Sequence, residues 1–279
     1  MIQVQDLVKT YNGKVQAVKG VSFQVAPGEI FGFLGPNGAG KTTTVRILSG
    51  LMDPSSGTAT VAGVQIPGDR QQLHRLIGVL FENSYLYETM TGKELLLFFC
   101  DLYRQPRKLV DELLELVEMT PKANELIKKY SKGMKQRIAF ARALLPQPRV
   151  LFLDEPTSGL DPASAVRLRE VVRETATRGT TVFLTTHNMD EADELCDRVG
   201  IINEGVIVAM DTPDALKESF SDRTVAFKMQ DGSNNILALN DPDLNQKMAA
   251  LIGQGVDKIN TVEPSLEDVF IRMTGRGLQ

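Results

Sequence analysis

A glycine-rich segment that ends in a lysine and two threonines carries the strongest chemical signal in the sequence. It reads Gly35, Pro36, Asn37, Gly38, Ala39, Gly40, Lys41 and Thr42, the G-x-x-x-x-G-K-[ST] pattern of a phosphate loop, and Thr43 follows it. The glycines allow backbone N–H groups to surround phosphate oxygens, and the start of a helix adds partial positive charge. We therefore predict that all nine residues bind a nucleotide, with Lys41 on its β- and γ-phosphates and Thr42 on Mg²⁺.

Two consecutive carboxylates follow an apolar run further along the chain. Residues 150–153 are all apolar, and Asp154 and Glu155 come directly after them. A carboxylate at the end of a parallel strand beside the phosphate-loop strand can hold Mg²⁺, which suits Asp154. Glu155 is then placed to polarise the attacking water, so we expect it to be catalytic together with Lys41. Any phosphate-loop NTPase would fit these two motifs.

The elements that must position these motifs follow from the hydrophobic pattern. Strand patterns over residues 30–34, 150–153 and 181–186 alternate with helix patterns, which predicts an α/β fold with a mostly parallel central sheet. Alternating apolar residues over 2–25 and 58–66 predict further strands, in an antiparallel β subdomain. Leucine and phenylalanine stripes at helical spacing between residues 91 and 130 predict a helical subdomain, over about residues 83–145.

The tail of the chain looks like a separate small domain. Residues 224–229 and 235–239 are expected to be strands, and residues 244–252 and 265–273 are expected to be helices. This is the pattern of an α+β appendage. We therefore expect an ATPase-like domain over residues 1–218 and an accessory domain over residues 219–279.

Composition restricts the class of protein. The net charge is −4 and the sequence pI is about 5.4, which argues against a nucleic-acid partner held by bulk charge. The best apolar run, residues 95–100, is far shorter than the about 20 residues of a membrane helix, so a role at a membrane would need another chain. No secretion signal is visible. Cys100 and Cys196 lack metal-binding spacing and are expected to be buried, reduced thiols of a cytosolic protein.

A third motif narrows the class of phosphate-loop NTPase to which the chain could belong. Residues 130–137, Tyr-Ser-Lys-Gly-Met-Lys-Gln-Arg, resemble the signature of the ATP-binding-cassette (ABC) family, usually written L-S-G-G-Q. Ser131 and Gly133 match that pattern, whereas Lys132 and Met134 depart from it. A serine hydroxyl and the free backbone N–H groups at a helix N-terminus form a site for an anion. The resemblance implies that this site binds the γ-phosphate held by a second subunit, so that two chains enclose two ATP molecules.

The other ABC motifs follow in order over about residues 1–215. The segment that ends in Asp161, Ser-Gly-Leu-Asp, resembles the D-loop, which crosses the dimer interface. His187 resembles the switch histidine that contacts the γ-phosphate, which implies a catalytic role. Tyr11 takes the place of the aromatic residue that stacks on adenine, with an edge-strand tyrosine as the alternative.

One motif departs from the family pattern. Residues 78–83 occupy the Q-loop, where a glutamine normally contacts Mg²⁺, and here the residue is Glu82. A glutamate can still ligate Mg²⁺, and more strongly; the alternative is that Glu82 points to solvent. This variant, the Tyr-Ser-Lys-Gly-Met signature and the tail segment 264–270 resemble the branch of antibiotic and multidrug exporters with separate ATPase and permease chains.

The resemblance implies an ATP-hydrolysing subunit that powers export through a separate permease. Its cofactors would be ATP and Mg²⁺, and its partners a second copy of the chain and a polytopic membrane permease, with no nucleic acid. It would be peripheral, on the cytoplasmic side of the cell membrane. The alternatives are an importer ATPase and a soluble, non-transport ABC ATPase acting on ribosomes or DNA. Soluble relatives usually carry two cassettes or long insertions, which this sequence lacks.

Overall fold

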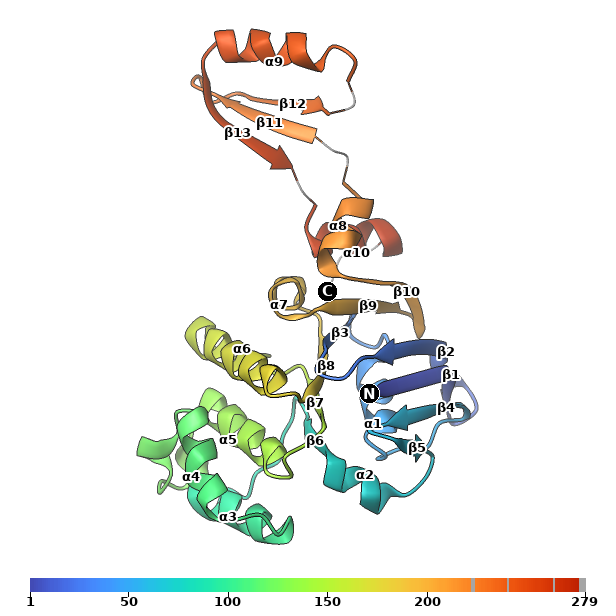
Figure 1. Cartoon of the computed structure of the whole chain (residues 1–279), viewed down its shortest axis with the longest axis vertical. Helices are drawn as coiled ribbons and strands as arrows, with labels where there is room; N and C mark the ends of the chain where they lie inside the picture. Colours follow the sequence, from blue (N-terminus) through green and yellow to red (C-terminus); the bar gives the residue numbers. More distant parts are fainter. Residues whose placement is uncertain (222–223, 240, 263, 276–279) are drawn as a thin grey trace. The chain divides into compact units, whose positions relative to one another are not determined.

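The computed structural model describes residues 1–221, 224–239, 241–262 and 264–275 (Figure 1). The chain divides into two compact units, Met1–Met210 and a second one that begins at Asp211. The second unit includes α8 (Pro213–Ser219) and α10 (Leu266–Thr274), which contact each other. The boundary expected from the sequence, after residue 218, falls within the last turn of α8.

A six-stranded sheet forms the centre of the first unit, in the order β10-β9-β3-β8-β7-β6. Strands β9, β3, β8, β7 and β6 pair in parallel, as predicted. Every residue of β3, β7 and β8 is buried, which is why these segments are mostly apolar, apart from Asp154 of β7 and the threonines at the ends of β8. The bounds are β3 (Ile30–Leu34), β6 (Ile77–Leu80), β7 (Val150–Asp154), β8 (Thr181–Thr186), β9 (Arg198–Asn203) and β10 (Val206–Asp211).

An antiparallel sheet packs against this centre, in the order β2-β1-β4-β5. Phe23 of β2 stacks on Phe31 of β3 with 5.6 Å between ring centroids, so the two sheets share one aromatic core. The expected single strand over residues 58–66 is a hairpin, because Ala62 and Gly63 both adopt positive φ. The bounds are β1 (Ile2–Tyr11), β2 (Val15–Val25), β4 (Ser56–Val61) and β5 (Val64–Ile66).

Seven α-helices of the first unit surround these sheets. Figure 1 shows α3, α4 and α5 grouped to one side of the central strands, which is the predicted helical subdomain. The capping box between Thr91 and Glu94 starts α3 at a defined residue. The bounds are α1 (Lys41–Leu48), α2 (Arg70–Leu76), α3 (Gly92–Leu102), α4 (Lys108–Leu116), α5 (Lys132–Leu144), α6 (Pro162–Thr177) and α7 (Met189–Leu195), with short 3-10 turns at Thr120–Lys122 and Ile127–Lys129.

The apolar stripe of α3 is only partly used in the core. Leu95, Leu96 and Cys100 are fully buried, whereas Phe98 and Leu102 are 49% and 63% exposed. The helix therefore presents one apolar face to its neighbours and leaves apolar side chains on another. Cys196, the second cysteine, is also buried, as expected, and neither cysteine forms a disulfide bond.

The second unit contains a three-stranded antiparallel sheet, in the order β12-β11-β13. Phe227 and its β11 neighbours Val225 and Met229 pack against Met248 and Leu251 of the adjoining helix. The strand β13 was not expected, since polar residues interrupt its apolar pattern. The bounds are β11 (Thr224–Met229), β12 (Asn234–Ala238), β13 (Val256–Val262) and α9 (Leu244–Gly253).

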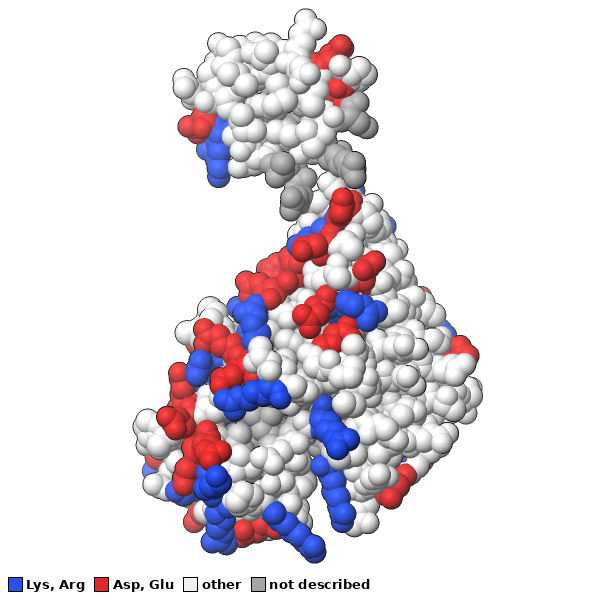
Figure 2. Space-filling view, viewed as in Figure 1, with Lys and Arg blue, Asp and Glu red and all other residues white. Residues whose placement is uncertain are grey.

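Charged side chains of both signs are interspersed on the face of the first unit that Figure 2 shows. Several form ion pairs, such as Arg167 with Glu118 and Arg169 with Glu194, each with 3.1 Å between nitrogen and oxygen. Within the described parts of the chain, no helix combines the length and the apolar character needed to cross a membrane.

Candidate active site

The phosphate-loop residues occupy the turn between β3 and α1, the strand–loop–helix setting that the motif requires. Two of its glycines are required because a side chain at either position would clash with the backbone of another segment. A Cβ at Gly35 would lie 2.2 Å from the carbonyl oxygen of Ile202, and one at Gly40 would lie 2.4 Å from that of Ala17. Gly40 also has a φ of 112°, which side-chain-bearing residues rarely adopt. Both ends of the loop therefore need glycine.

Lys41, the first residue of α1, is folded back over this loop. Its side chain is 6% exposed, and Nζ donates hydrogen bonds to the carbonyl oxygens of Gly35 at 2.5 Å and Pro36 at 3.3 Å. Nζ also lies 3.2 Å from Oε1 of Glu155. The lysine and the carboxylate predicted to be catalytic therefore form a buried ion pair beside the phosphate loop.

Glu155 contacts the third residue that was predicted to be catalytic. Its Oε2 lies 2.8 Å from Nδ1 of His187 and accepts a hydrogen bond of 3.4 Å from the His187 backbone N–H. Glu155 has a φ of 52°, and its backbone N–H donates to the carbonyl oxygen of Thr185 at 3.0 Å. The Glu155 side chain is 9% exposed and that of His187 is 50% exposed. Lys41, Glu155 and His187 thus form one connected cluster that opens to solvent at the histidine.

Asp154, at the end of β7, lies beside the first turn of α1. Its Oδ1 accepts hydrogen bonds from the hydroxyls of Thr185 at 2.5 Å and Thr42 at 3.2 Å. Burial raises the pKa of Asp154, and the two hydroxyls oppose that rise. The hydroxyl of Thr42 and the carboxylate of Asp154 are hard oxygen donors of the type that Mg²⁺ prefers. Two of the three predicted metal ligands therefore lie together.

The third predicted metal ligand, Glu82, is engaged elsewhere. Its Oε1 accepts a hydrogen bond of 3.4 Å from the hydroxyl of Ser158, in the segment that resembles the D-loop. It makes no hydrogen bond to Thr42 or Asp154. Across the described residues, no group of three or more histidine, cysteine or acidic side chains is arranged to hold a metal ion. The protein alone supplies an incomplete ligand set, centred on Thr42 and Asp154.

Tyr11 ends β1 close to the start of α1. Its hydroxyl lies 3.3 Å from Oγ1 of Thr43 and 3.3 Å from the sulfur of Met52. The Nζ atom of Lys9 is 5.7 Å from the centre of the Tyr11 ring. Two residues predicted to contact the nucleotide, Tyr11 and Thr43, are therefore in contact with each other.

The signature residues lie at the start of α5. Ser131 is its N-cap, and its hydroxyl accepts a hydrogen bond of 3.2 Å from the backbone N–H of Met134. Neither Ser131 nor Gly133 makes a hydrogen bond to the phosphate loop of its own chain. Lys132 lies over the D-loop, since a Cβ at Gly159 would come 2.1 Å from Lys132 Nζ.

Asp161 also has a local role in the structure. It is the N-cap of α6, with Oδ1 accepting from the Ser164 backbone N–H at 3.0 Å and Oδ2 accepting from the Ser164 hydroxyl at 2.7 Å. These hydrogen bonds hold the pKa of Asp161 below its usual range. The end of the D-loop is therefore fixed at the start of a long helix.

One residue of this region was missed in the sequence. Glu191 is in the first turn of α7, next to the segment that carries His187, and is only 1% exposed. The surrounding sequence, Met-Asp-Glu-Ala-Asp-Glu-Leu, contains four acidic residues and reads as a solvated helix. No local signal distinguishes Glu191 from the other three.

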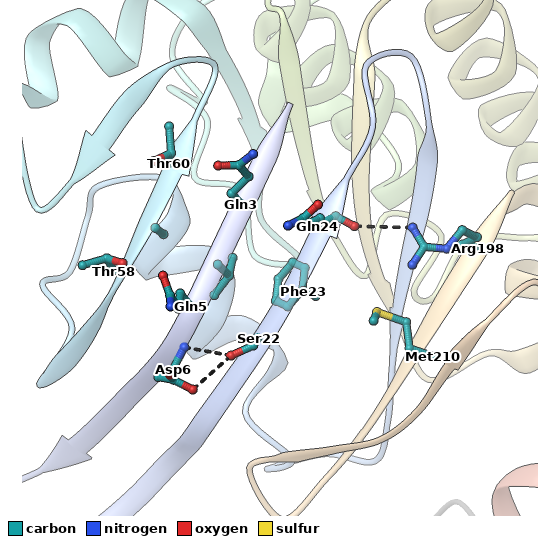
Figure 3. Close-up of a pocket in the computed structure, with 12 residues that line it drawn as sticks. Gln3, Gln5, Asp6, Ser22, Phe23, Gln24, Thr58, Thr60, Arg198 and Met210 are labelled. Atoms are coloured by element: carbon teal, nitrogen blue, oxygen red, sulfur yellow. Dashed lines mark hydrogen bonds between the residues drawn. The ribbon is translucent and has the colours of Figure 1, made fainter.

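A shallow hollow of about 800 Å³ lies on the outer face of the antiparallel sheet, away from these residues (Figure 3). Gln3, Gln5 and Gln24 line it together with Thr58 and Thr60. Its two charged side chains are already engaged, Asp6 with Ser22 and Arg198 with the carbonyl oxygen of Gln24. None of the predicted site residues lines this hollow.

A second hollow, a groove of about 280 Å³, lies close to the Q-loop segment. Aromatic side chains line it, including Phe81, Phe99 and Tyr103. The guanidinium of Arg142 lies 5.4 Å from the ring centre of Phe99 and donates a hydrogen bond of 3.0 Å to the carbonyl oxygen of Tyr85. Leu51, which lines the groove, is 55% exposed, and large side chains of the helical subdomain are also exposed: Tyr85 92%, Tyr87 56%, Phe98 49% and Leu102 63%.

Comparisons with known proteins show the family of the chain. The family model described as ABC transporter matches residues 18–158. A fluoroquinolones export ATP-binding protein of Mycobacterium tuberculosis is 42% identical over 287 aligned positions, covering 100% of this chain and 94% of that protein. The linearmycin resistance ATP-binding protein of Bacillus subtilis is 34% identical over the whole of both chains. A Nod factor export ATP-binding protein of Rhizobium johnstonii is 36% identical, covering 100% and 96%.

Solved structures show the same fold. An ATP-binding cassette solved as a dimer in a post-hydrolysis state, with ADP and phosphate, matches with a TM-score of 0.70 and 27% identity, covering 76% of this chain and 98% of that chain. An ATP-binding subunit of an ABC transporter matches with a TM-score of 0.72 and 29% identity, covering 79% and 93%. The predicted α/β cassette is confirmed, and the importer and soluble alternatives are not favoured. The chain therefore belongs to the ABC transporter family, as an ATP-binding, ATP-hydrolysing subunit of its exporter branch.

Proposed function

We propose that two copies of this chain enclose two ATP molecules and drive a separate membrane permease, which exports a drug, an antibiotic or a related compound. The observation that carries the proposal is the connected cluster of Lys41, Glu155 and His187 beside the phosphate loop. It combines a cation for phosphate oxygens and an imidazole, each of which contacts the same carboxylate, at 3.2 Å and 2.8 Å. The relatives named for fluoroquinolones, linearmycin and Nod factor support the class of transported compound.

The cluster assigns a role to each residue in hydrolysis. Lys41 stabilises negative charge on the β- and γ-phosphate oxygens as it develops. Glu155 orients the attacking water and accepts its proton. His187 holds the carboxylate of Glu155 through Nδ1 and leaves its other ring nitrogen for the γ-phosphate.

Binding of the nucleotide is assigned to the loop and its neighbours. The backbone N–H groups of Gly35 and of residues 37–43 would surround the phosphates, since Pro36 has no N–H, and Tyr11 would stack on the adenine. Thr42 and Asp154 would hold Mg²⁺, which would neutralise negative charge on the phosphates. Glu82 would complete the ligand set only by leaving the hydroxyl of Ser158, with which it pairs here.

Residues of the signature and D-loop are assigned to the second copy. Ser131 and Gly133 lie on the helical subdomain and make no hydrogen bond to their own phosphate loop. Their helix N-terminus would bind the γ-phosphate held by the partner. Asp161, at the end of the D-loop, would lie at the interface between the copies. The dimeric cassette solved with ADP and phosphate supports this arrangement.

The aromatic groove near the Q-loop is assigned to the permease. Exposed aromatic and leucine side chains that gather around one groove mark a binding surface for an apolar partner. The groove touches Phe81, one residue before Glu82, so a partner bound there would sense changes at the Q-loop. Binding to a polytopic permease would place the chain on the cytoplasmic side of the cell membrane.

Co-purification tests this proposal. The chain would be expressed at native level with an affinity tag, and a polytopic membrane protein should co-purify with it. Replacing Tyr85 and Phe98 by serine should abolish the association and leave ATP binding unchanged. Recovery of ribosomes or of no membrane protein would contradict the transport function, whereas unchanged association of the variant would contradict only the docking surface.

A further inference from the structure

Glu191 is a buried carboxyl group for which the reaction described above gives no role. Its side chain is 1% exposed, and neither carboxyl oxygen has a partner in full hydrogen-bond geometry among the described residues. A buried polar group without good partners costs free energy. A glutamate at such a position destabilises the fold compared with an apolar residue, so packing alone does not account for it.

Two threonine hydroxyls interact with this carboxyl group. Burial raises the pKa of Glu191, and the hydroxyls of Thr157 and Thr186 oppose that rise, so both are close although neither is aligned as a full hydrogen bond. The charged groups that also act on it are Arg169 of α6, which lowers its pKa, and Glu155, which raises it. The carboxyl group therefore interacts with hydroxyl groups of two different segments.

These two segments carry the proposed catalytic pair. Thr157 is two residues after Glu155, in a turn closed by the hydrogen bond of 3.2 Å from the Ser158 N–H to the Glu155 carbonyl oxygen. Thr186 is the residue before His187, and its hydroxyl accepts a hydrogen bond of 3.0 Å from the N–H of Asn188. A group that links the two threonines would fix the carboxylate and the imidazole relative to each other.

The backbone of Glu191 is itself held in place. Its N–H donates to Oδ1 of Asn188 at 3.1 Å, and α7 packs on β3 and β8. Both hydroxyls lower the pKa of Glu191, so each favours the carboxylate form, whose oxygens can accept hydrogen bonds from the two threonines.

We propose that Glu191 is a positioning residue for ATP hydrolysis, which bridges Thr157 and Thr186 and so holds Glu155 and His187 in their working geometry. It contacts neither the nucleotide nor the attacking water. This inference rests on the roles proposed above for Glu155 and His187. It predicts an effect on the chemical step and not on nucleotide binding, since a small misplacement of catalytic groups lowers the rate far more than the affinity.

The test compares neutral replacements in the full-length chain. Glu191→Gln keeps a donor and an acceptor and should retain kcat within about twofold, whereas Glu191→Leu should lower kcat by about tenfold or more. KM for ATP and affinity for a fluorescent ATP analogue should change by less than about threefold in both. Asp190→Asn, an exposed change in the same helical turn, is the matched control and should behave as wild type.

Thr157→Val provides a second route if Glu191→Leu does not fold. It removes one hydroxyl of the bridge and should lower kcat without changing KM. Its effect should not add to that of Glu191→Leu in the double variant, because both changes break the same bridge. Wild-type kcat in Thr157→Val, or a glutamine variant as slow as the leucine variant, would overturn the inference. Glu155→Gln is assayed in parallel: if it still turns over, the proposed catalytic role itself is wrong.

Discussion

The carboxylate of Glu155 and the imidazole of His187 are joined at 2.8 Å between Oε2 and Nδ1, although the residues come from the ends of different strands. Their strands β7 and β8 are parallel neighbours, with Asp154 in register with Thr185. The carboxyl ends of both strands therefore meet at one edge of the sheet, beside the phosphate loop that follows β3. This geometry makes the pair the natural target of a first test.

Glu155→Gln should bind ATP but turn it over at least about 100-fold more slowly, because the amide cannot accept the proton of the attacking water. With Mg-ATP it should accumulate as a dimer, since hydrolysis would no longer separate the two copies. Sedimentation velocity with and without Mg-ATP measures this. Asp190→Asn should remain monomeric after turnover, and a Glu155→Gln chain that stays monomeric at all ATP concentrations would argue against the two-copy arrangement.

Glu82→Gln separates the two interpretations of the Q-loop. If Glu82 ligates Mg²⁺ in the ATP state, its removal should raise the Mg²⁺ concentration for half-maximal ATPase rate by roughly tenfold, while metal-free ATP binding is unchanged or improved. Mg²⁺ titrations of wild type and variant measure the difference. Ser158→Ala, which removes the hydrogen bond to Glu82, serves as the comparison. Superimposable titrations for wild type and Glu82→Gln would exclude Glu82 from the metal site.

Removal of the second unit should spare nucleotide binding, because none of the predicted site residues lies beyond Met210. A chain that ends at residue 210 should bind a fluorescent ATP analogue within about threefold of the wild-type affinity. A chain that ends at residue 218 should bind equally well but be less soluble, since it keeps α8 without α10 and exposes Leu216. Loss of binding in a folded 1–210 chain would show that the second unit contributes to the site.

The raised pKa of Glu191 predicts a pH dependence of stability. A carboxyl group with a raised pKa in the folded state contributes stability below its ordinary pKa of about 4.3 and loses it as pH rises through the folded-state pKa. The glutamine of Glu191→Gln does not titrate, so the variant does not lose this stability as pH rises. The free energy of unfolding of the variant, relative to that of the wild type, should therefore increase with pH, by about 1.4 kcal/mol for each unit by which the pKa is raised. Urea unfolding at pH 5 and pH 8 measures it, and a constant difference would mean that Glu191 does not titrate in this range.

The phosphate loop could be predicted closely because its geometry demands its residues. A Cβ atom at Gly35 or Gly40 would lie within 2.4 Å of a backbone oxygen, so only glycine fits at these two positions of the turn. The buried strands were equally clear, since a parallel sheet covered on both faces leaves few polar positions, here Asp154 of β7 and the threonines at the ends of β8.

Other features depend on contacts that no local pattern records. The stripe of α3 has more apolar residues than its neighbours cover, so the sequence could not show that Phe98 remains exposed while Leu96 is buried. The contact of Glu82 with Ser158 joins two loops 76 residues apart. Glu191 resembles the exposed acids beside it, and only the packing of α7 on β3 and β8 buries it.

The two cysteines of the chain should react poorly with thiol reagents. Cys100 and Cys196 are its only thiols, both are buried, and burial raises the pKa of each, that of Cys196 well above its usual value. Since the thiolate is the reactive form, maleimide dyes should not react with the folded wild-type chain. A single cysteine placed on the exposed surface of α6 or α3 would then carry a dye at one known position. Energy transfer between two such copies would report their approach directly, without removing either native cysteine.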